Sequence, residues 1–313
     1  MLRPRLAVLL ACAATVLAGA GAALHDPPAP RPPAFANAPV APPPPPGAIK
    51  RVVIVVEENK DYGRIAGAPD APVINALAAR GTLLTSYYAI RHPSLPNYLA
   101  ILAGDTFGIE HNCTDCTVSA LSLVDQLEAA GISWKAYLQG LPAPCSDVAR
   151  AGNYAKKHNP FLYFDRVRHD EPRCAKVVAF DEFGADLASG RLPQFAFVVP
   201  DQAHDMHDGP VAAGDAWLGS LYEQLAASSA WREDTRLVVT FDEASGDQTC
   251  CAGLASGGRI ATVVVGPAVP AGVVDATEYT HYDLLHSVES LFGLGYLGHA
   301  GDPRATDIPS VSG

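Results

Sequence analysis

Carboxylate, amide and imidazole side chains follow three short hydrophobic segments that are predicted to be buried strands. The strands cover residues 52–56, 195–199 and 236–241, and the groups behind them are Glu58, Asn59, Asp205, His207, Asp242 and Glu243. In an open parallel sheet the ligand crevice lies beyond the carboxyl ends of the strands, so these groups are expected to converge. Carboxylates that converge without basic residues among them repel one another unless cations lie between them. The pattern therefore predicts a metal site at this edge of the sheet.

Each of these groups also has an ordinary structural interpretation. Asn59 suits a turn, and residues 205–208 could form a solvated polar loop. His281, at the start of a helix predicted over residues 281–292, could cap that helix or lie on the surface. Only convergence with other groups in one crevice would make these residues ligands.

A serine stands at the start of another predicted helix, in the segment RHPSLPNY. Pro96 fits the first turn of a helix, so Ser94 is expected just before a helix N-terminus whose free N–H groups and dipole favour an anionic oxygen. Taken alone, the segment favours a plain N-cap serine. In a crevice that holds cations, however, such a serine can be ionised and attack phosphorus in line.

The predicted strands alternate with helical patterns. Two more strands are predicted over residues 133–138 and 260–265, and the helices are predicted over residues 71–80, 121–130, 215–227 and 281–292. Alternation of this kind predicts an α/β fold with a mostly parallel central sheet and helices on both faces.

The composition limits the class of partner. The chain has 313 residues, 49% of them hydrophobic, and can bury one sizeable core. A net charge of -11 argues against a nucleic-acid partner, because binding nucleic acid needs clustered Lys and Arg. The charge that binds an anionic substrate must then be local, from metals, backbone N–H groups or a few basic side chains.

The N-terminal residues predict export. Arg3 and Arg5 precede an uncharged run rich in Ala and Leu, which is typical of a signal peptide and is assigned here to residues 1–24. An uncleaved membrane anchor is the alternative, because the run approaches spanning length. A lipoprotein site at Cys12 is disfavoured, since only a short apolar stretch precedes it. The remaining segments are a Pro-rich linker, a catalytic domain and a C-terminal tail, predicted over residues 25–48, 49–300 and 301–313.

Six cysteines remain after the signal segment, and an even number in an exported chain predicts disulfides. They are Cys113, Cys116, Cys145, Cys174, Cys250 and Cys251. Their connectivity stays open. Half a zinc site or a redox motif is the alternative for the C-x-x-C pair, but no second pair stands at matching spacing.

Five motifs in a fixed order resemble the phosphoesterase family of secreted bacterial acid phosphatases and phospholipases C, above all its mycobacterial-type acid phosphatases. They are VVIVVEEN, HPSLPNYLAILAGDTFG, VVPDQAHDMHDGPVAAGDAWL, VVTFDEASGD and YTHYDLL, and the match extends over nearly all of residues 51–295. That family is similar in fold to the alkaline phosphatase superfamily. The resemblance therefore implies an alkaline phosphatase-like fold, a crevice for two cations and a covalent phosphoserine intermediate.

The resemblance also implies a role for each matching residue. Ser94 would be the nucleophile, Asn97 would contact the phosphoryl oxygens, and Lys157 and His158 would balance phosphate charge. The first cation would be held by Glu58, Asn59, Asp242 and Glu243, and the second by Asp205, His207 and His281. Asp201 and His204 are additional candidates. The oxygen-rich first set shifts the expectation from Zn toward Ca, Mg or Mn, and leaves the metal's identity open.

The implied activity is that of a secreted, metal-dependent acid phosphatase that hydrolyses phosphomonoesters, among them phospholipid-derived ones. No protein partner is implied. A phospholipase C-like phosphodiesterase shares the same crevice and stays open as an alternative. A non-catalytic phosphate- or lipid-binding surface protein is the other alternative, and the intact set of Ser94 and ligand residues argues against it. The absence of a G-x-S-x-G elbow disfavours an esterase of the α/β-hydrolase kind.

Overall fold

A sheet with the strand order β10-β2-β9-β8-β1-β7-β3-β6 organises the computed structural model, which describes residues 50–232 and 235–313. Its strands are β1 (Arg51–Glu57), β2 (Thr82–Tyr88), β3 (Trp134–Leu138), β6 (Val177–Ala179), β7 (Phe195–Val199), β8 (Thr235–Phe241), β9 (Arg259–Val265) and β10 (Val273–Thr280). The strands β4 (Arg150–Ala151) and β5 (Tyr154–Ala155) form a separate small hairpin. The signal-peptide and linker predictions for residues 1–48 lie outside the described residues.

Ten α-helices accompany the strands in the described residues. They are α1 (Pro72–Arg80), α2 (Ser94–Ala103), α3 (Leu123–Ala129), α4 (Asp165–Arg168), α5 (Glu171–Cys174), α6 (Asp181–Ala188), α7 (Val211–Ala227), α8 (Ser229–Arg232), α9 (His281–Phe292) and α10 (Pro309–Ser312). Short 3-10 turns add η2 (Tyr62–Arg64), η3 (Lys156–His158), η4 (Pro160–Tyr163), η5 (Cys251–Gly253) and η6 (Gly298–Gly301). None of the helices within residues 50–232 and 235–313 is long and apolar enough to cross a membrane.

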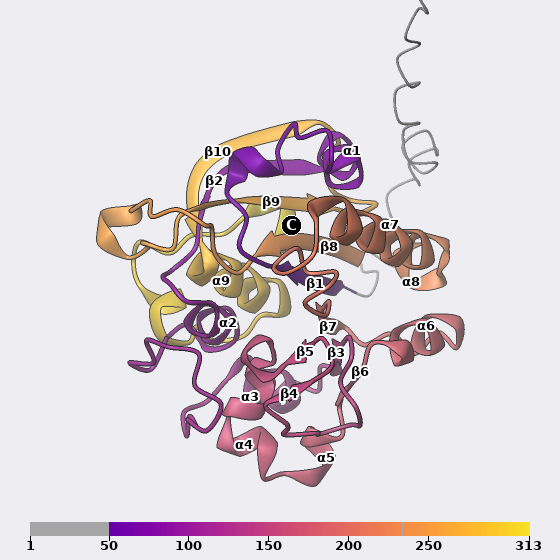
Figure 1. Cartoon of the computed structure of the whole chain (residues 1–313), viewed down its shortest axis with the longest axis vertical. Helices are drawn as coiled ribbons and strands as arrows, with labels where there is room; N and C mark the ends of the chain where they lie inside the picture. The colour runs from indigo at the N-terminus through magenta and orange to yellow at the C-terminus, as the bar shows by residue number, and fades with distance from the viewer. Residues whose placement is uncertain (1–49, 233–234) are drawn as a thin grey trace, which may run out of the picture. The chain divides into compact units, whose positions relative to one another are not determined.

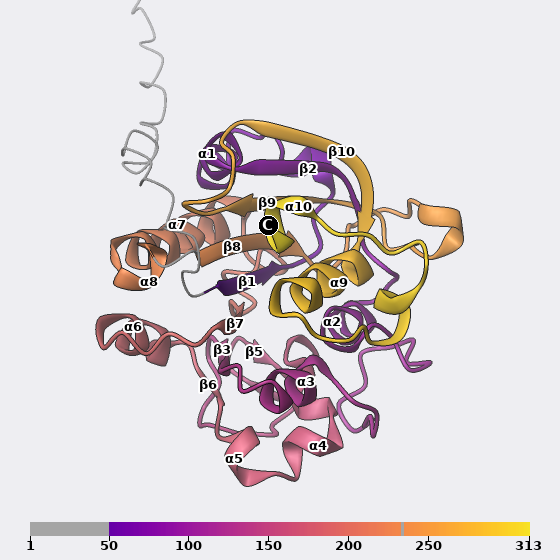
Figure 2. The same ribbon diagram turned by 180° about the vertical axis from the view of Figure 1, so that it is seen from behind.

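The predicted α/β architecture is confirmed. Helices α1, α6 and α7 cover one face of the sheet, and α2, α3 and α9 cover the other (Figures 1 and 2). Covered on both sides, the central strands β1, β7 and β8 are buried along their whole length. All five predicted strands are present, and β9, predicted over residues 260–265, is the one that runs antiparallel to its neighbours β2 and β8.

The direction of the strands gathers the chemistry at one edge. Because β9 is the reversed strand, β1, β2, β7, β8 and β10 all point the same way and their carboxyl ends lie at the same edge of the sheet. Helix α2 follows β2 after a short loop, and α9 follows β10 directly. The groups that the sequence places after β1, β7 and β8 therefore meet residues carried by two helix starts.

Residues within the predicted C-terminal tail pack against the folded core. Ile308 and Val311 are fully buried in the main hydrophobic cluster. The backbone N–H of Ile308 donates to the Ser287 hydroxyl of α9 at 2.7 Å, and that of Thr306 donates to Asp283 Oδ1 at 2.9 Å. Apolar burial and these two contacts fix the segment against α9.

The predicted disulfides are present. Cys113 is bonded to Cys116, Cys145 to Cys174, and Cys250 to Cys251. The C-x-x-C pair is thus a disulfide in this structure. The structure also pairs two adjacent cysteines, a connectivity that an even count of cysteines cannot specify.

Candidate active site

Ser94 is the first residue of α2 and is buried. Pro93 occupies the N-cap position, and no side chain of α2 itself caps the helix. This corrects the expectation that Ser94 stands just before the helix. It also limits the anion-binding capacity of the helix start, because the Leu95 N–H already donates to Asn112 Oδ1 at 3.0 Å and Pro96 has no N–H.

The Ser94 hydroxyl lies between a carboxylate and an ammonium group. Its Oγ donates to Glu58 Oε2 at 3.1 Å and accepts from Lys157 Nζ at 3.3 Å. Burial alone would raise the pKa of Glu58, but His158, Lys157 and the hydroxyl of Tyr98 lower it to about 2. An ionised acceptor thus orients the hydroxyl, while a cationic side chain stands beside its oxygen.

Asn97, predicted to contact phosphoryl oxygens, holds the loop that precedes Ser94. Its Oδ1 accepts from the backbone N–H groups of Ile90 and Arg91 at 2.9 and 3.1 Å. Its Nδ2 donates to the carbonyls of Arg91 and Pro93 at 2.6 and 3.2 Å. The side chain is fully buried, so in this structure it shapes the loop, and its contact with phosphate stays a prediction.

Groups that follow β1 and β8 contact one another. Asp242 Oδ1 accepts from the backbone N–H groups of Asn59 at 3.0 Å and of Glu243 at 2.6 Å. Asp242 Oδ2 and Asn59 Oδ1 are buried and accept no hydrogen bond. Burial, and then the charges of Glu58 and Glu243, raise the pKa of Asp242 well above its usual range.

Glu243 completes this group. Burial raises the pKa of Glu243 to about 7, although its Oε2 lies 2.6 Å from His92 Nδ1. Buried oxygen atoms without donors and carboxyl groups with raised pKa values are what a divalent cation would compensate. The oxygen donors Glu58, Asn59, Asp242 and Glu243 therefore fit a hard cation.

A second cluster surrounds His158, which is buried. Its Nε2 lies 3.1 Å from Glu58 Oε1, and its Nδ1 lies 3.3 Å from Asp205 Oδ2. Burial favours neutral imidazole, but Glu58 and Asp205 outweigh it and raise the pKa of His158. Donor atoms of Glu58, His158 and Asp205 lie within 4.8 Å of one another, close enough to hold one ion. The predicted phosphate-binding histidine therefore lies among the carboxylates.

The predicted second ligand set of Asp205, His207 and His281 does not assemble. His281 Nε2 donates to the Asp242 carbonyl at 2.7 Å, and its Nδ1 lies 3.1 Å from the Tyr87 hydroxyl. Both ring nitrogens are thus engaged, and burial lowers the pKa of His281 to about 4, so the ring is neutral. His281 therefore holds the backbone of Asp242 through this hydrogen bond.

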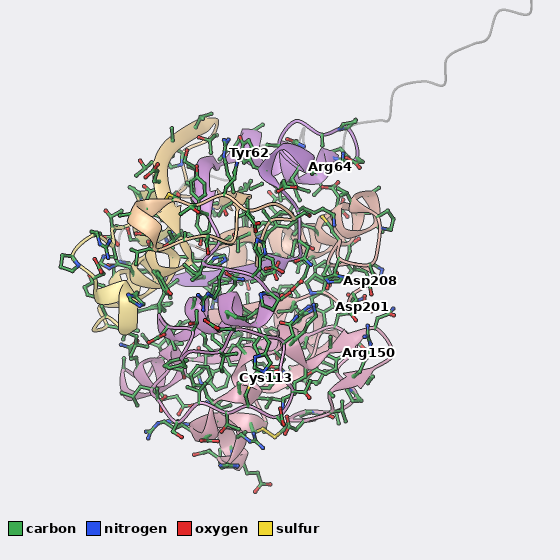
Figure 3. The ribbon with its side chains drawn as sticks, turned by 60° about the vertical axis from the view of Figure 1, so that its left-hand side comes forward. Tyr62, Arg64, Cys113, Arg150, Asp201 and Asp208 are labelled. Carbon is green, nitrogen blue, oxygen red and sulfur yellow. A yellow bond between two sulfur atoms is a disulfide. The ribbon has the colours of Figure 1, made fainter. Side chains whose placement is uncertain are left out.

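His207 meets Asp205 through its backbone only. Its N–H donates to Asp205 Oδ1 at 2.7 Å, while its ring Nδ1 lies 2.7 Å from Asp208 Oδ1. Asp201 and His204, the additional candidates, pair with each other at 2.8 Å. Asp208 Oδ2 lies 3.9 Å from the guanidinium of Arg150 of β4, and Figure 3 shows Asp201 in the same region.

Two residues of the site carried no predicted role. The Tyr98 hydroxyl donates to Glu58 Oε1 at 2.6 Å, and His92 contacts Glu243 and, through Nε2 at 3.2 Å, Asp247. Tyr98 stands four residues after Ser94, a spacing that places both on one face of a helix and could have revealed it. His92 precedes Ser94 by two residues in a loop, where no such periodicity applies.

Comparison with known proteins places this chain in a family. A model of the phosphoesterase family matches residues 68–295. A phosphatidylinositol-3-phosphatase of Mycobacterium tuberculosis is 39% identical over 258 residues, which cover 81% of each chain. An acid phosphatase of Aspergillus fumigatus is 34% identical over 77% of this chain and 54% of its own. A non-hemolytic phospholipase C of Burkholderia pseudomallei is 26% identical over 55% of this chain and 32% of its own.

The fold is also found among solved structures. A protein of the alkaline phosphatase superfamily from Vibrio parahaemolyticus superposes with a TM-score of 0.56, covering 84% of this chain and 72% of that one. The two sequences are 17% identical, so the likeness is one of fold. It confirms the predicted alkaline phosphatase-like architecture.

Proposed function

We propose that this chain, which belongs to the phosphoesterase family and is a hydrolase of phosphate esters, is an acid phosphatase that acts on phosphomonoesters through Ser94. One observation carries the proposal. The buried Ser94 hydroxyl lies between Glu58 Oε2 and Lys157 Nζ, beside oxygens of Asn59 and Asp242 that have no donor. This arrangement supports a serine nucleophile with a cationic partner and with oxygens suited to a metal ion.

Glu58, Asn59, Asp242 and Glu243 would hold a divalent cation such as Mg, Ca or Mn, since their donors are oxygens. When bound, that cation lowers the pKa of the serine hydroxyl and balances phosphate charge. A second cation would find its donors in Glu58, His158 and Asp205, which lie together, in place of the set with His207 and His281. We thus propose two ions, and we propose Mg, Ca or Mn for the first.

The residues of the chain divide the remaining work. Glu58 accepts the hydrogen bond of Ser94 and so aims an oxygen lone pair at the substrate. Ser94 Oγ bonds to phosphorus while its O–H bond and the bond from phosphorus to the leaving oxygen break, and the proton passes through solvent to the leaving oxygen. A water oxygen then bonds to phosphorus while the bond between Ser94 Oγ and phosphorus breaks, and a proton from that water restores the Ser94 hydroxyl. Lys157 Nζ stands where negative charge gathers in both steps, so it stabilises both transition states by charge and position. Asn97 and His281 keep the loop and Asp242 in place.

Export is a further part of the proposal. The predicted signal peptide and the three disulfides of the described residues support an oxidising compartment outside the cytoplasm. The relative named phosphatidylinositol-3-phosphatase supports a phosphorylated lipid headgroup as one substrate class. A phospholipase C-like diesterase remains the second candidate, because a phospholipase C is among the relatives.

Hydrolysis of p-nitrophenyl phosphate and of bis-p-nitrophenyl phosphate tests the proposal. We expect the purified mature chain to prefer the monoester, to lose this activity with chelator and to regain it with divalent ions. Preference for the diester would favour the phospholipase-like candidate, and cleavage of neither compound would favour a binding protein. The Ser94→Ala variant, prepared in parallel, controls for contaminating phosphatases.

A further inference from the structure

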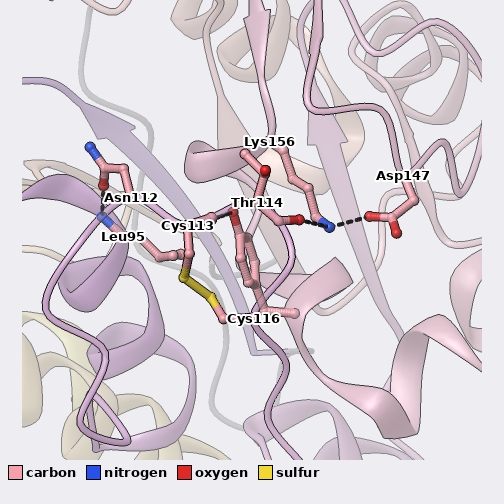
Figure 4. The surroundings of a disulfide bond; sticks show 8 residues. Leu95, Asn112, Cys113, Thr114, Cys116, Asp147 and Lys156 are labelled. Atoms are coloured by element: carbon pink, nitrogen blue, oxygen red, sulfur yellow. Dashed lines mark hydrogen bonds and ion pairs between the residues drawn. A yellow bond between two sulfur atoms is a disulfide. The ribbon is translucent and has the colours of Figure 1, made fainter.

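A short loop closed by the Cys113–Cys116 disulfide lies between the helix that carries Ser94 and the turn that carries Lys157 (Figure 4). Only three positions separate the two cysteines. Asn112, which directly precedes this loop, contacts α2, and Thr114, within the loop, contacts η3. The segment thus contacts the residue that follows Ser94 and the residue that precedes Lys157, without touching the reacting atoms.

On the helix side, Asn112 replaces a missing cap. Pro93 at the N-cap position has no side-chain acceptor, so the first turn of α2 needs an acceptor from elsewhere. Asn112 Oδ1 supplies it by accepting from the Leu95 N–H at 3.0 Å. Since Leu95 directly follows Ser94, this bond fixes the part of the helix from which the Ser94 hydroxyl projects.

On the other side, the loop holds a buried lysine. Lys156 Nζ donates to the Thr114 carbonyl at 2.7 Å and pairs with Asp147 Oδ1 at 2.5 Å. It also lies 5.0 Å from the centre of the Tyr163 ring, whose hydroxyl donates to the Cys113 carbonyl at 2.7 Å. The next residue, Lys157, reaches Ser94 Oγ. The loop therefore determines the position of the turn that aims Lys157.

We propose that residues 112–116 form a positioning element of the active site. Asn112 sets the first turn of α2, the Thr114 carbonyl sets η3, and the Cys113–Cys116 bond holds these two acceptors at a constant separation. Catalysis by a positioned nucleophile and cation depends on keeping that geometry narrow. The inference rests on the proposed function, because it concerns the contact between Ser94 and Lys157.

The variant Asn112→Ala tests the helix side without disturbing the core, since Asn112 is exposed. We expect kcat for p-nitrophenyl phosphate to fall roughly three- to thirtyfold, the factor that corresponds to loss of one helix cap, while KM changes little. Asn112→Asp, which keeps the acceptor oxygen, should restore most of the rate. Asp115→Ala, an exposed change in the same loop that removes neither contact, serves as the matched control. A wild-type kcat for Asn112→Ala would overturn the proposal.

A double variant tests the disulfide. Cys113→Ser with Cys116→Ser should lower kcat at a temperature well below unfolding. Cys145→Ser with Cys174→Ser, which removes neither the Asn112 nor the Thr114 hydrogen bond, should lower the melting temperature and leave kcat near that of the wild type. Equal losses of kcat in both double variants would mean that the Cys113–Cys116 disulfide only stabilises the fold, and would contradict the proposal.

These experiments distinguish failure of the positioning role from failure of the proposed function. If the wild type hydrolyses the monoester and Ser94→Ala does not, the proposed function stands, and unchanged kcat in the loop variants refutes only the positioning role. If Ser94→Ala retains the wild-type rate, the proposed function fails, and the positioning role fails with it.

Discussion

Lys157 offers a direct measure of how much charge the site supplies on its own. Its Nζ donates to Ser94 Oγ at 3.3 Å. Lys157 belongs to the short turn η3 and not to a strand or a long helix. Replacing it by Met removes the ammonium and keeps most of the apolar stem. The phosphoryl oxygens would lie next to Ser94 Oγ, so the variant should lose a charge–charge contact of about 4 Å.

The size of the loss follows from that distance. Two unit charges about 4 Å apart at an effective dielectric constant of about 20 attract by about 4 kcal/mol. A hydrogen bond to a charged group contributes about 1.5–3 kcal/mol in net terms. Lys157 is only partly buried, so we take about 3 kcal/mol, which is roughly a hundredfold in kcat/KM.

Steady-state hydrolysis of p-nitrophenyl phosphate by Lys157→Met, Lys157→Arg and the wild type measures this effect. The Arg variant keeps the charge and should fall between the other two. Lys176→Met is the matched control, because Lys176 pairs with Glu128 at 2.7 Å and lies over the Trp134 ring, neither of which belongs to the site. A kcat/KM within threefold of the wild type for Lys157→Met would refute the role of this lysine.

Two further predictions concern stability. Burial raises the pKa of Glu289 on α9 to about 8, so between about pH 4.3, the unfolded value, and pH 8 the folded chain binds the extra proton and loses stability as pH rises. Glu289→Gln should flatten the fall in melting temperature between pH 5 and pH 8, and an unchanged slope would contradict this. Loss of Cys145–Cys174, with a separation of 29 positions, should lower the free energy of unfolding by about 4 kcal/mol, against about 2 kcal/mol for Cys113–Cys116, with a separation of 3. Urea denaturation measures both losses, and equal losses would argue against the loop-length account.

The gathering of oxygen-bearing side chains at the ends of β1 and β8 was predictable because it follows from the direction of the strands. Long apolar runs identify the strands, and the rule for parallel sheets brings Glu58, Asn59, Asp242 and Glu243 to one edge. The structure places them there, with Asp242 bonded to the backbone of Asn59 and Glu243. Predicting that these residues lie at one edge of the sheet did not require knowing how their side chains are oriented.

The second ligand set failed at the step that does need orientation. His281 begins α9 after β10, an edge strand whose largely exposed, polar residues gave no strand signal. Which way its ring points depends on β2, also not predicted, because Tyr87 of that strand lies against it. His158 was assigned to phosphate for a similar reason, since its place between Glu58 and Asp205 arises from a turn without periodicity.

The exact first residue of α2 could not be predicted from the sequence either. The sequence predicts a helix at Pro96 but cannot decide whether Ser94 caps it or begins it. The structure makes Pro93 the N-cap and recruits Asn112 from a distant loop to satisfy Leu95. Asn112 directly precedes Cys113, whose disulfide partner the count of cysteines leaves open.

The most direct test of the central claim is to trap the phosphoryl group on the enzyme. Substrate is mixed with excess protein, the reaction is quenched in acid, and peptides are examined by mass spectrometry. The account predicts one added phosphoryl group, located on Ser94 and absent from Ser94→Ala. Rapid hydrolysis with a phosphoryl group on another residue, or with none on any residue under conditions that accumulate intermediates, would contradict it.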